Sequence, residues 1–437
     1  MTREPITYLV WSDLVGVART RGVPTELLPR RTETGLGWAC AGQALTAFGS
    51  IVDNPWGPMD EARQIPDLAT RFSYRSAVDD SGWEAVICDS RRSTSEDWDC
   101  CVRTFYRRAL DDLAAETGLT LAASFEHEFL LEAPTPVEEG FTFAAARRAN
   151  GFLQACSAAL RTAGVVPESL EPEYGREQYE ISCAPAIGVA GADAALIARE
   201  VIRAVAADHG LRVSFTPKPA RKAVGNGAHI HFSLVDVKSG ENTTHDPAGP
   251  LGLSATAAHF CAGILDHLEA LVAISAPTPV SYYRLTPHAW SCGFKAIGVQ
   301  NREAALRVTP SASPDADARR RGFNVEYRPC DATASPYLTL GALVRAGLDG
   351  VRRKLALPPA IDRDPADLSA GELGALGITP LPASLEEALA ALARDTTATA
   401  WFSTTLMEVY RRLKLWECDL AHELDEVTLL ARYRDAY

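Results

Sequence analysis

The sequence has few of the features that mark membrane or nucleic-acid-binding proteins. No segment approaches the roughly 20 consecutive apolar residues that span a bilayer. The first residues, MTREPITYLVW, lack an apolar run with a small-residue cleavage site, so we expect a cytoplasmic protein without a membrane partner. Basic residues are in deficit, with 43 Lys and Arg against 56 Asp and Glu. The net charge of -13 argues against a nucleic-acid partner, because phosphates require a positive surface.

Thiol-based sites are also missing from the pattern. The ten cysteines include no Cys-x-x-Cys pair, so the sequence predicts reduced, mostly buried thiols rather than a thiolate zinc site or a redox motif. No internal repeat or low-complexity tract is long enough to shape the fold. What the sequence does contain is 437 residues with 47% hydrophobic and 23% charged side chains. That is enough for a large buried core and for two domains.

Two parts with different patterns divide the chain. Residues 1–96 mix short apolar runs with Pro/Gly breaks such as NPWGP, which predicts a small strand-rich domain before a larger one over 97–437. A helix is predicted from about Ser95 to a stop at Gly118, followed by a strand over 119–132. The composition of 310–322 is typical of a surface loop. Further helices are expected over 143–164, 193–210, 255–275, 334–355 and from about 384.

Paired carboxylates occur in SFEHEFLL. Side chains alternate between the faces of a strand, so Glu126 and Glu128 share one face while Phe125 and Phe129 point the other way. Two adjacent carboxylates raise each other's pKa, and burying them is unfavourable unless a cation neutralises them. A metal ion would satisfy that requirement.

A similar alternation occurs in GAHIHFSL. His229, His231 and Ser233 fall on one face of a strand, and Ile230 and Phe232 fall on the other. An isolated His-x-His is as consistent with a solvated or hydrogen-bonded strand face as with a functional site. The pattern alone leaves both alternatives open.

Two further segments place acidic residues at strand-like positions. Glu173 and Glu180 bracket a Gly-containing turn in EPEYGREQYEIS. Glu326 shares a strand face with Arg328 in NVEYRPCD. Each pair on its own also fits a solvated strand face or a surface ion pair.

Guanidinium groups complete the pattern. In NREAALR, Arg302 and Arg307 suit phosphate recognition, because a planar guanidinium donates paired, charge-assisted hydrogen bonds. Taken together, the five segments supply oxygen ligands, an imidazole and phosphate-binding groups. This combination favours hard divalent cations, Mg²⁺ or Mn²⁺, that hold a nucleoside triphosphate, and it makes zinc a poorer fit.

In order and spacing, six segments resemble the signature segments of the glutamine synthetase family, over essentially the whole chain. They are SFEHEFLL, EYGREQYEIS, FTPKPARKAVGNGAHIHFSL, SYYRLTP, NREAALRV and NVEYRPCDATASPYLTLGALVRAGLDG. The resemblance implies an α+β fold with an N-terminal β-grasp domain (1–96) and a catalytic domain (97–437) whose curved antiparallel sheet is flanked by helices. It also implies a homo-oligomer, a dodecamer of two hexameric rings with active sites between neighbouring subunits.

The resemblance also implies roles for single residues. The ligands of one metal ion are Glu128, Glu173 and Glu180, and those of the second are Glu126, His229 and Glu326. Nucleotide and phosphate contacts fall to His231, Ser233 and Arg307. The residues that hold glutamate and the transferring phosphoryl group are Arg284, Arg302, Arg328 and, through its backbone, Gly225. The implied reaction is attack of the γ-carboxylate of L-glutamate on the γ-phosphate of ATP, giving an acyl phosphate that an amine then opens.

This chain departs from the family pattern at the amine side. Trp290 stands six positions after Arg284, where the family has an acidic flap residue. The Asp-Gly-Ser-Ser element that binds and deprotonates ammonium is replaced by GWACAGQALTAFGS. Loss of both carboxylates removes the attraction for ammonium and the base that deprotonates it. Asn324 also stands where the family usually has an arginine near the nucleotide.

These departures predict a γ-glutamyl–amine ligase that uses a small primary amine larger than ammonia. Trp290 suits an apolar wall or a cation–π platform for that amine, although a flap tryptophan that merely packs is the alternative. We expect ethanolamine or a similar amine with a neutral tail ahead of putrescine and spermidine, and ammonium last. The alternatives are polyamine γ-glutamylation, an authentic glutamine synthetase, a ligase for another acid, and a non-catalytic assembly. All six metal-ligand positions are filled, which argues against the last.

Overall fold

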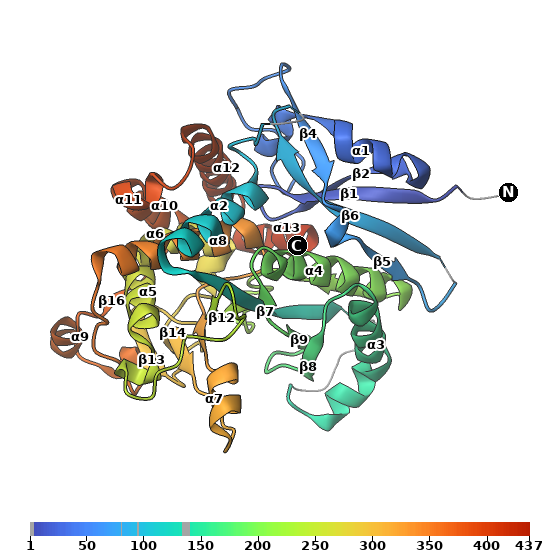
Figure 1. Cartoon of the computed structure of the whole chain (residues 1–437). Helices are drawn as coiled ribbons and strands as arrows, with labels where there is room; N and C mark the ends of the chain where they lie inside the picture. The colour runs from blue at the N-terminus through green and yellow to red at the C-terminus, as the bar shows by residue number, and fades with distance from the viewer. Residues whose placement is uncertain (1–3, 80, 94–95, 133–139) are drawn as a thin grey trace.

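The chain is built around two β-sheets (Figure 1). A computed structural model describes residues 4–79, 81–93, 96–132 and 140–437. The strands of the first sheet are β1 (Ile6–Ser12), β2 (Ala18–Pro24), β3 (Leu36–Ala39), β4 (Glu61–Pro66), β5 (Phe72–Arg75) and β6 (Gly82–Arg91). Their order is β2-β1-β6-β4-β3, with β5 also paired to β6, and β1 runs parallel to β6. The strand-rich N-terminal part is therefore confirmed.

The second sheet is larger and contains the predicted site strands. Its members are β7 (Leu119–Glu132), β8 (Pro167–Pro172), β9 (Gln178–Cys183), β10 (Ala186–Ile187), β11 (Arg212–Ser214), β12 (Ala228–Asp236), β13 (Phe294–Val299), β14 (Ala304–Thr309), β15 (Asn324–Tyr327) and β16 (Thr379–Pro380). The order is β16-β13-β14-β15-β12-β7-β9-β8, and β10 and β11 also pair with β7. The expected antiparallel sheet is in fact mixed, because β13 and β14 run parallel. Gln300, with a positive φ of 55°, lies in the connection between them.

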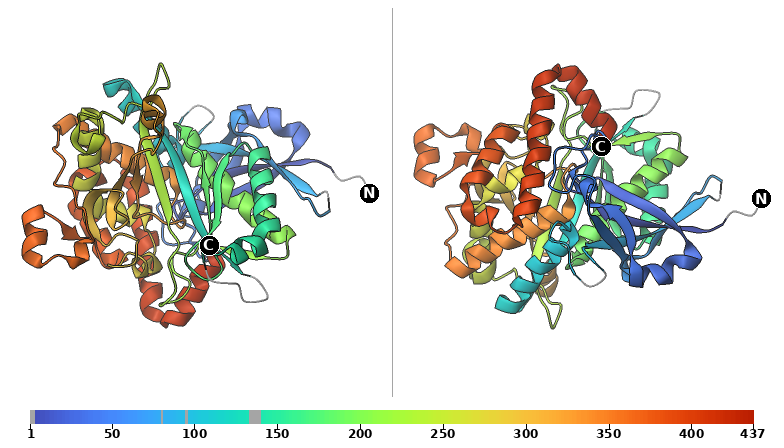
Figure 2. Two further views of the ribbon diagram at one scale, coloured as in Figure 1. Left: turned by 90° about the horizontal axis from the view of Figure 1, so that it is seen from below. Right: turned by 90° about the horizontal axis from the view of Figure 1, so that it is seen from above.

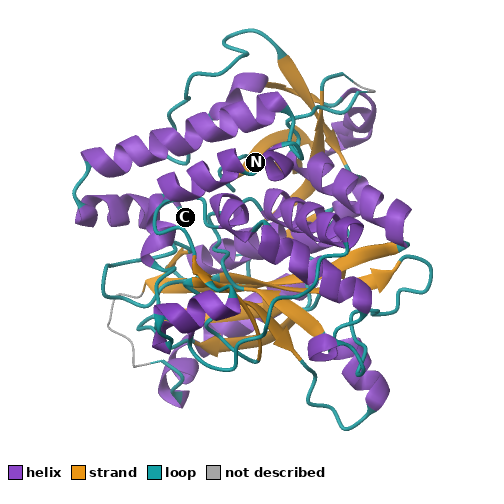
Figure 3. Ribbon diagram, turned by 90° about the vertical axis from the view of Figure 1, so that its left-hand side faces the viewer, coloured by secondary structure: helices purple, strands orange, loops and turns teal. Residues whose placement is uncertain are grey.

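Helices flank this sheet, and in Figure 3 most of them lie on one side of it. They are α1 (Leu28–Thr34), α2 (Val102–Thr117), α3 (Phe143–Thr162), α4 (Ala190–Asp208), α5 (Ala255–Asp266), α6 (Leu268–Ser275), α7 (Ala316–Gly322), α8 (Pro336–Arg353), α9 (Ala370–Leu376), α10 (Leu385–Arg394), α11 (Thr396–Thr399), α12 (Thr404–Glu423) and α13 (Glu426–Ala436). Helices α2 and α4 contact β7, and α8 packs against both α2 and α5. The predicted α+β class is confirmed.

Several predicted boundaries hold and others do not. Strand β7 covers the predicted residues, and α2 ends at Gly118, whose φ of 73° is left-handed, as a C-terminal glycine allows. Helix α2 begins at Val102 rather than near Ser95, which itself lies outside the described residues. The prediction of a loop holds over 310–315 but was wrong over 316–322, because Asp315 caps a short helix, α7, by accepting from the backbone N–H of Ala318 at 2.7 Å.

The single helix expected over 255–275 is broken. Helices α5 and α6 meet at His267 with a bend of 76°. The buried imidazole is held from both sides, since Nδ1 lies 2.6 Å from Asp395 Oδ2 and Nε2 lies 3.0 Å from Asp349 Oδ2. Among the described residues, no single helix is long and apolar enough to cross a membrane. All ten cysteines are buried and free, as predicted.

One buried arginine joins the N-terminal sheet to the rest of the chain. Arg103 on α2 donates to Asp193 of α4 (2.9 Å), to Asp89 of β6 (3.0 Å) and to Asp67, which follows β4 (2.9 Å). Its residue exposure is only 4%, so these contacts are shielded from solvent. In both views of Figure 2 the blue N-terminal strands stand beside the larger sheet rather than within it. Arg103 lies where the two parts meet.

Candidate active site

The alternation of β7 separates core residues from polar ones. Phe125 and Phe129 are 5% and 0% exposed and point into the core, as the sequence predicts. Glu126 and Glu128 therefore share the opposite face of the strand. Two carboxylates are thus presented on a rigid, central strand that pairs on both sides.

Cross-strand register then adds the histidines and a further carboxylate. In the pairing of β12 with β7, His229 lies directly opposite Glu126. In the pairing of β12 with β15, His231 lies opposite Glu326. Residues directly opposite each other have Cβ atoms about 5 Å apart, so the register brings these side chains within reach of one another.

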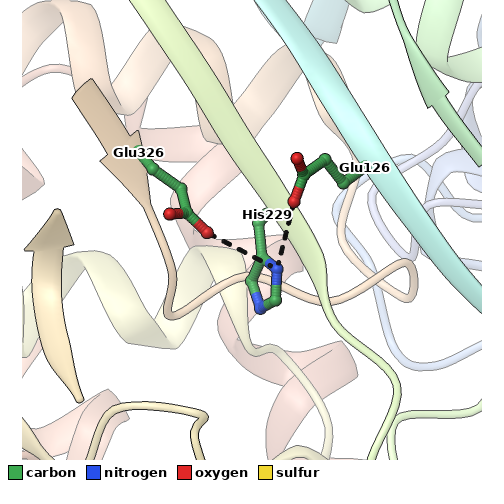
Figure 4. A group of neighbouring side chains, drawn as sticks. All are labelled: Glu126, His229 and Glu326. Carbon is green, nitrogen blue, oxygen red and sulfur yellow. Dashed lines mark ion pairs between the residues drawn. The ribbon is translucent and has the colours of Figure 1, made fainter. Parts of the chain in front are cut away.

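His229 is the centre of the first cluster. Its Nδ1 lies 3.6 Å from each of three carboxylate oxygens, Glu126 Oε2, Glu128 Oε1 and Glu326 Oε1. Figure 4 shows Glu126 and Glu326 pointing toward the imidazole from β7 and β15. Ligand atoms of Glu126, His229 and Glu326 all lie within 4.8 Å of one another. This donor set fits a hard divalent cation.

A second cluster forms on β8 and β9. Carboxylate oxygens of Glu171, Glu173 and Glu180 lie within 4.8 Å of one another. Burial, followed by the charge of Glu128, raises the pKa of Glu173 to about 7. Burial, followed by the charges of Glu126 and Glu128, raises the pKa of Glu180 to about 10. Carboxylates that repel each other this strongly fit a site that a divalent cation neutralises.

Glu128 lies between the two clusters. It pairs in register with Glu180, and its Oε2 accepts the backbone N–H of Gly227 at 2.7 Å, while its Oε1 faces His229. Its predicted membership of the metal site with Glu173 and Glu180 remains a prediction. Glu171, which the sequence analysis did not single out, belongs to the second cluster by geometry.

His231 is hydrogen-bonded on both sides. Its Nδ1 lies 2.7 Å from Asn324 Oδ1, and its Nε2 lies 2.9 Å from Glu126 Oε1. Burial alone would lower the pKa of His231, but the hydrogen bond and charge of Glu126 raise it to about 9. Ser233 donates its Oγ to the carbonyl of Phe323 at 3.0 Å. The predicted contact of both residues with a nucleotide remains a prediction.

Two of the predicted arginines converge on Glu326. This carboxylate is fully buried and accepts from Arg328 and, at 2.7 Å, from Nη1 of Arg307. Burial would raise the pKa of Glu326, but the charge of Arg328 holds it below its ordinary value. Arg328 also donates its Nε to the carbonyl of Arg302 at 2.9 Å and its Nη2 to that of Trp290 at 2.7 Å. One buried guanidinium thus links the first cluster to the flap.

Arg284 and Gly225 meet at another wall of the site. Arg284 is 3% exposed and donates Nη2 to the carbonyl of Cys330 at 2.8 Å. A Cβ at position 225 would lie 2.5 Å from Cγ of Arg284 and 3.0 Å from the carbonyl oxygen of Pro217. Glycine is therefore required for this close approach of backbone to side chain.

Trp290 lies on an exposed, conformationally unusual flap. The residue is 65% exposed, and its φ of 52° is in the left-handed region that non-glycine residues rarely adopt. Its backbone N–H donates to Glu303 Oε1 at 2.7 Å, while its carbonyl accepts from Arg328. Glu303 is 6% exposed, and burial raises its pKa. Glu303, which the sequence analysis did not single out, therefore holds the backbone of Trp290, the predicted specificity residue.

Most of the predicted site residues surround one cavity of about 590 Å³. The predicted residues that line it are Glu128, Glu173, Glu180, Gly225, His229, Arg284, Trp290, Arg302 and Arg328. Those that do not line it are Glu126, His231, Ser233, Arg307 and Glu326. A second cavity of about 510 Å³ shares Tyr174, Gln178 and Lys222 with the first. Lys218 also lines the first cavity, although sequence analysis had given it no role.

Two clusters of metal-ligand type thus lie beside a set of arginines, an arrangement suited to divalent cations and phosphate groups. The family model described as "Glutamine synthetase, catalytic domain" matches residues 99–429. The chain is 35% identical over 442 residues to the gamma-glutamylpolyamine synthetase GlnA3 of Streptomyces coelicolor, with 98% of this chain and 93% of that protein covered. The chain therefore belongs to the glutamine synthetase family and is a glutamate–amine ligase.

Two solved structures are similar over nearly the whole chain. One, described as the crystal structure of a novel glutamine synthase homolog, has a TM-score of 0.91 and 35% identity, covering 100% of this chain and 99% of that one. The other, a GmaS/ADP complex, has a TM-score of 0.82 and 25% identity, covering 97% of this chain and 95% of that one. The fold expected from the sequence resemblance is thus confirmed.

Proposed function

We propose that this enzyme γ-glutamylates an organic primary amine, with a polyamine as the first candidate and ethanolamine as the second. The γ-carboxylate of L-glutamate takes the γ-phosphoryl group of ATP, giving ADP and γ-glutamyl phosphate. The amine nitrogen then forms a bond to the carbonyl carbon of the γ-carboxyl group, the bond from that carbon to the phosphate oxygen breaks, inorganic phosphate leaves, and the amine loses one proton. The amide product retains the α-amino and α-carboxyl groups of glutamate.

The observation that carries the proposal is the convergence of the two clusters and the arginines on one cavity. The residues proposed to hold Mg²⁺ or Mn²⁺ are Glu128, Glu173 and Glu180 for one ion and Glu126, His229 and Glu326 for the other. When bound, such ions supply positive charge that offsets the charge on the phosphoryl oxygens. The exposed guanidinium of Arg302 lines the same cavity and is free to approach a phosphoryl group. Glu326 orients Arg328 and Arg307 through its two carboxylate oxygens.

The amine end of the cavity supports a substrate larger than ammonium. Trp290 offers an exposed aromatic face where the family pattern has an acid, and it lines the cavity. Residues 37–50, which replace the ammonium-binding element, do not line the cavity of their own chain. A compact cation such as ammonium would therefore find little to hold it on the aromatic surface alone.

Two observations separate the polyamine from ethanolamine. The adjoining cavity of about 510 Å³ leaves room for a long amine, and the similarity to a relative named as a polyamine enzyme supports that choice. The sequence analysis had placed ethanolamine first, because Trp290 presents no carboxylate for a second ammonium group. The comparisons favour the polyamine alternative over that ranking.

We also propose that the protein assembles as a ring-built homo-oligomer, up to a dodecamer, in which a neighbour's N-terminal part completes the amine side. Residues 37–50 do not line the cavity of their own chain, which supports this arrangement. Sedimentation should give a large particle that carries the activity, and a fully active monomer would contradict it.

Phosphate release tests the function directly. The protein is incubated with ATP, Mg²⁺ and L-glutamate and with one of ammonium, ethanolamine, putrescine or spermidine, and the product is identified by mass. We expect the highest kcat/KM with a polyamine. A higher value with ethanolamine would make it the substrate, and a higher value with ammonium than with every organic amine would overturn the proposal.

A further inference from the structure

Lys218 is a buried lysine held rigidly at the wall of the catalytic cavity. It lies between β11 and β12, lines the cavity and is 8% exposed. Prolines precede and follow it, which restricts the backbone on both sides. The segment is also tied down, because Asn226 donates its backbone N–H to the carbonyl of Pro217 at 2.9 Å and its Nδ2 to that of Thr216 at 2.8 Å. The backbone at Lys218 is therefore held in place at the cavity wall.

No carboxylate neutralises this lysine within the part of the chain that the structure describes. None of the ion pairs or side-chain hydrogen bonds there includes Lys218. Its charged surroundings are positive, since Arg284 and Arg221 lower the pKa of Lys218 further after burial has lowered it. Arg221 itself lies 3.8 Å from Glu426, so that carboxylate is already shared with another cation. A buried ammonium without a partner is unfavourable unless an anion binds beside it.

Arg284 points to the same requirement. Its Nε is buried and has no hydrogen-bond partner among the described residues, and its Nη2 donates only to backbone carbonyls. Gly225 connects the two cations, because a Cβ there would contact both the Arg284 side chain and the carbonyl of Pro217, next to Lys218. Lys218 and Arg284 thus form a basic wall with unused donors. A carboxylate is the anion that such a wall would bind in a glutamate-using enzyme.

Glutamate carries two carboxylates, and the carboxylate clusters determine which one reaches the basic wall. The γ-carboxylate must lie at the metal-binding clusters, where the phosphoryl group is transferred. The α-carboxylate cannot share that acidic region without its own counter-charge. We propose, on the basis of the function proposed above, that Lys218 binds the α-carboxylate of the amino acid substrate together with Arg284. Lys218 would then select a substrate with a second carboxylate, such as glutamate, over a monocarboxylic acid or a simple amine.

The test compares Lys218→Met with Lys238→Met, because Lys238 is an exposed lysine that lines neither of the two cavities. Steady-state phosphate release gives kcat and KM for glutamate, ATP and the best amine, and calorimetry gives glutamate binding without turnover. We expect Lys218→Met to weaken glutamate binding and raise its KM by about 10- to 100-fold, as loss of one charge-assisted hydrogen bond predicts. The KM values for ATP and amine should stay within about twofold, as should all values for Lys238→Met. Lys218→Arg, which keeps the charge, should recover most of the glutamate affinity.

Competitive inhibition by glutarate and by 4-aminobutyrate shows which end of the substrate Lys218 contacts. Only glutarate keeps a carboxylate at both ends. Lys218→Met should therefore weaken inhibition by glutarate by the same factor as it weakens glutamate binding, and it should leave inhibition by 4-aminobutyrate unchanged. Equal weakening of both analogues, or an unchanged KM for glutamate in Lys218→Met, would overturn this inference. If the unaltered protein releases no phosphate with glutamate and any amine, the proposed function fails instead. Should Lys218→Met not fold, the comparison of Lys218→Arg with Lys218→Gln decides by the same readouts.

Discussion

Replacing Glu326 and Glu126 separately by Gln distinguishes structural charge pairing from metal binding. Both carboxylates lie 3.6 Å from Nδ1 of His229. Glu326 is fully buried and neutralises two guanidinium groups, so Glu326→Gln leaves buried charge without a partner and should lower the free energy of unfolding by about 3–5 kcal/mol. The side chain of Glu126 is 25% exposed and has one imidazole at close range, with Nε2 of His231 2.9 Å from its Oε1. Glu126→Gln should therefore lower the free energy of unfolding by only about 1–2 kcal/mol.

Urea unfolding of the metal-free proteins, in the presence of a chelator, measures these two values. The loss in Glu326→Gln should be at least about twice the loss in Glu126→Gln. Adding Mg²⁺ should then stabilise each variant less than the unaltered protein, because each variant lacks one ligand of the first cluster while the second cluster is intact. Equal losses in the metal-free state, or a larger loss for Glu126→Gln, would refute the argument that the arginine pairs make Glu326 structural.

Three further changes test other parts of the site. Glu180→Ala should reduce the rise in Tm caused by Mg²⁺ and abolish ATP-dependent phosphate release while circular dichroism stays unchanged, and normal turnover would exclude Glu180 from the metal site. Trp290→Glu should lower kcat/KM for the organic amine by about 10-fold or more and raise the residual ammonium reaction, whereas an unchanged amine preference would mean that Trp290 only packs. Glu303→Ala removes the acceptor for the Trp290 N–H and should raise the KM for amine by several-fold, while Glu303→Gln, which keeps an oxygen there, should change it by less than about twofold. Equal kinetics in both Glu303 variants would contradict a role in holding the flap.

Sequence patterns predicted those helices and strands whose ends are set by residues close together in the chain. Strand β7 was predicted at its observed bounds, because alternation and the glycine stop are readable from adjacent residues. The break at His267 was not predicted, because the carboxylates of Asp349 and Asp395 that hold the ring lie 82 and 128 residues away. Helix α7 was missed because a short, exposed helix has no apolar periodicity, although Asp315 is a good cap.

In the site, too, features set by neighbouring residues were predicted, whereas features set by contacts between distant segments were not. The spacing of Glu126 and Glu128 predicts a shared face, but only the register of β12 against β7 places His229 beside them. Glu303 was missed, although it directly follows Arg302, because its contact is with a flap that folds back from another segment. Lys218 is visible as a lysine between two prolines. Its lack of a counter-charge appears only when the neighbouring residues are placed around it.

The contacts of Arg103 have a mechanical consequence for the way ligands reach the cavity. The guanidinium is bonded to carboxylates of β6, of α4 and of the segment after β4, so it ties the first sheet to α2 and α4, the helices that contact β7 of the second sheet. Moving the two sheets apart would break the ion pairs of the buried Arg103 guanidinium. Leaving a buried charge without its partner costs several kcal/mol of free energy. The two sheets should therefore move as one body. Ligand exchange then depends on displacement of short rim segments such as the flap around Trp290, which is 65% exposed.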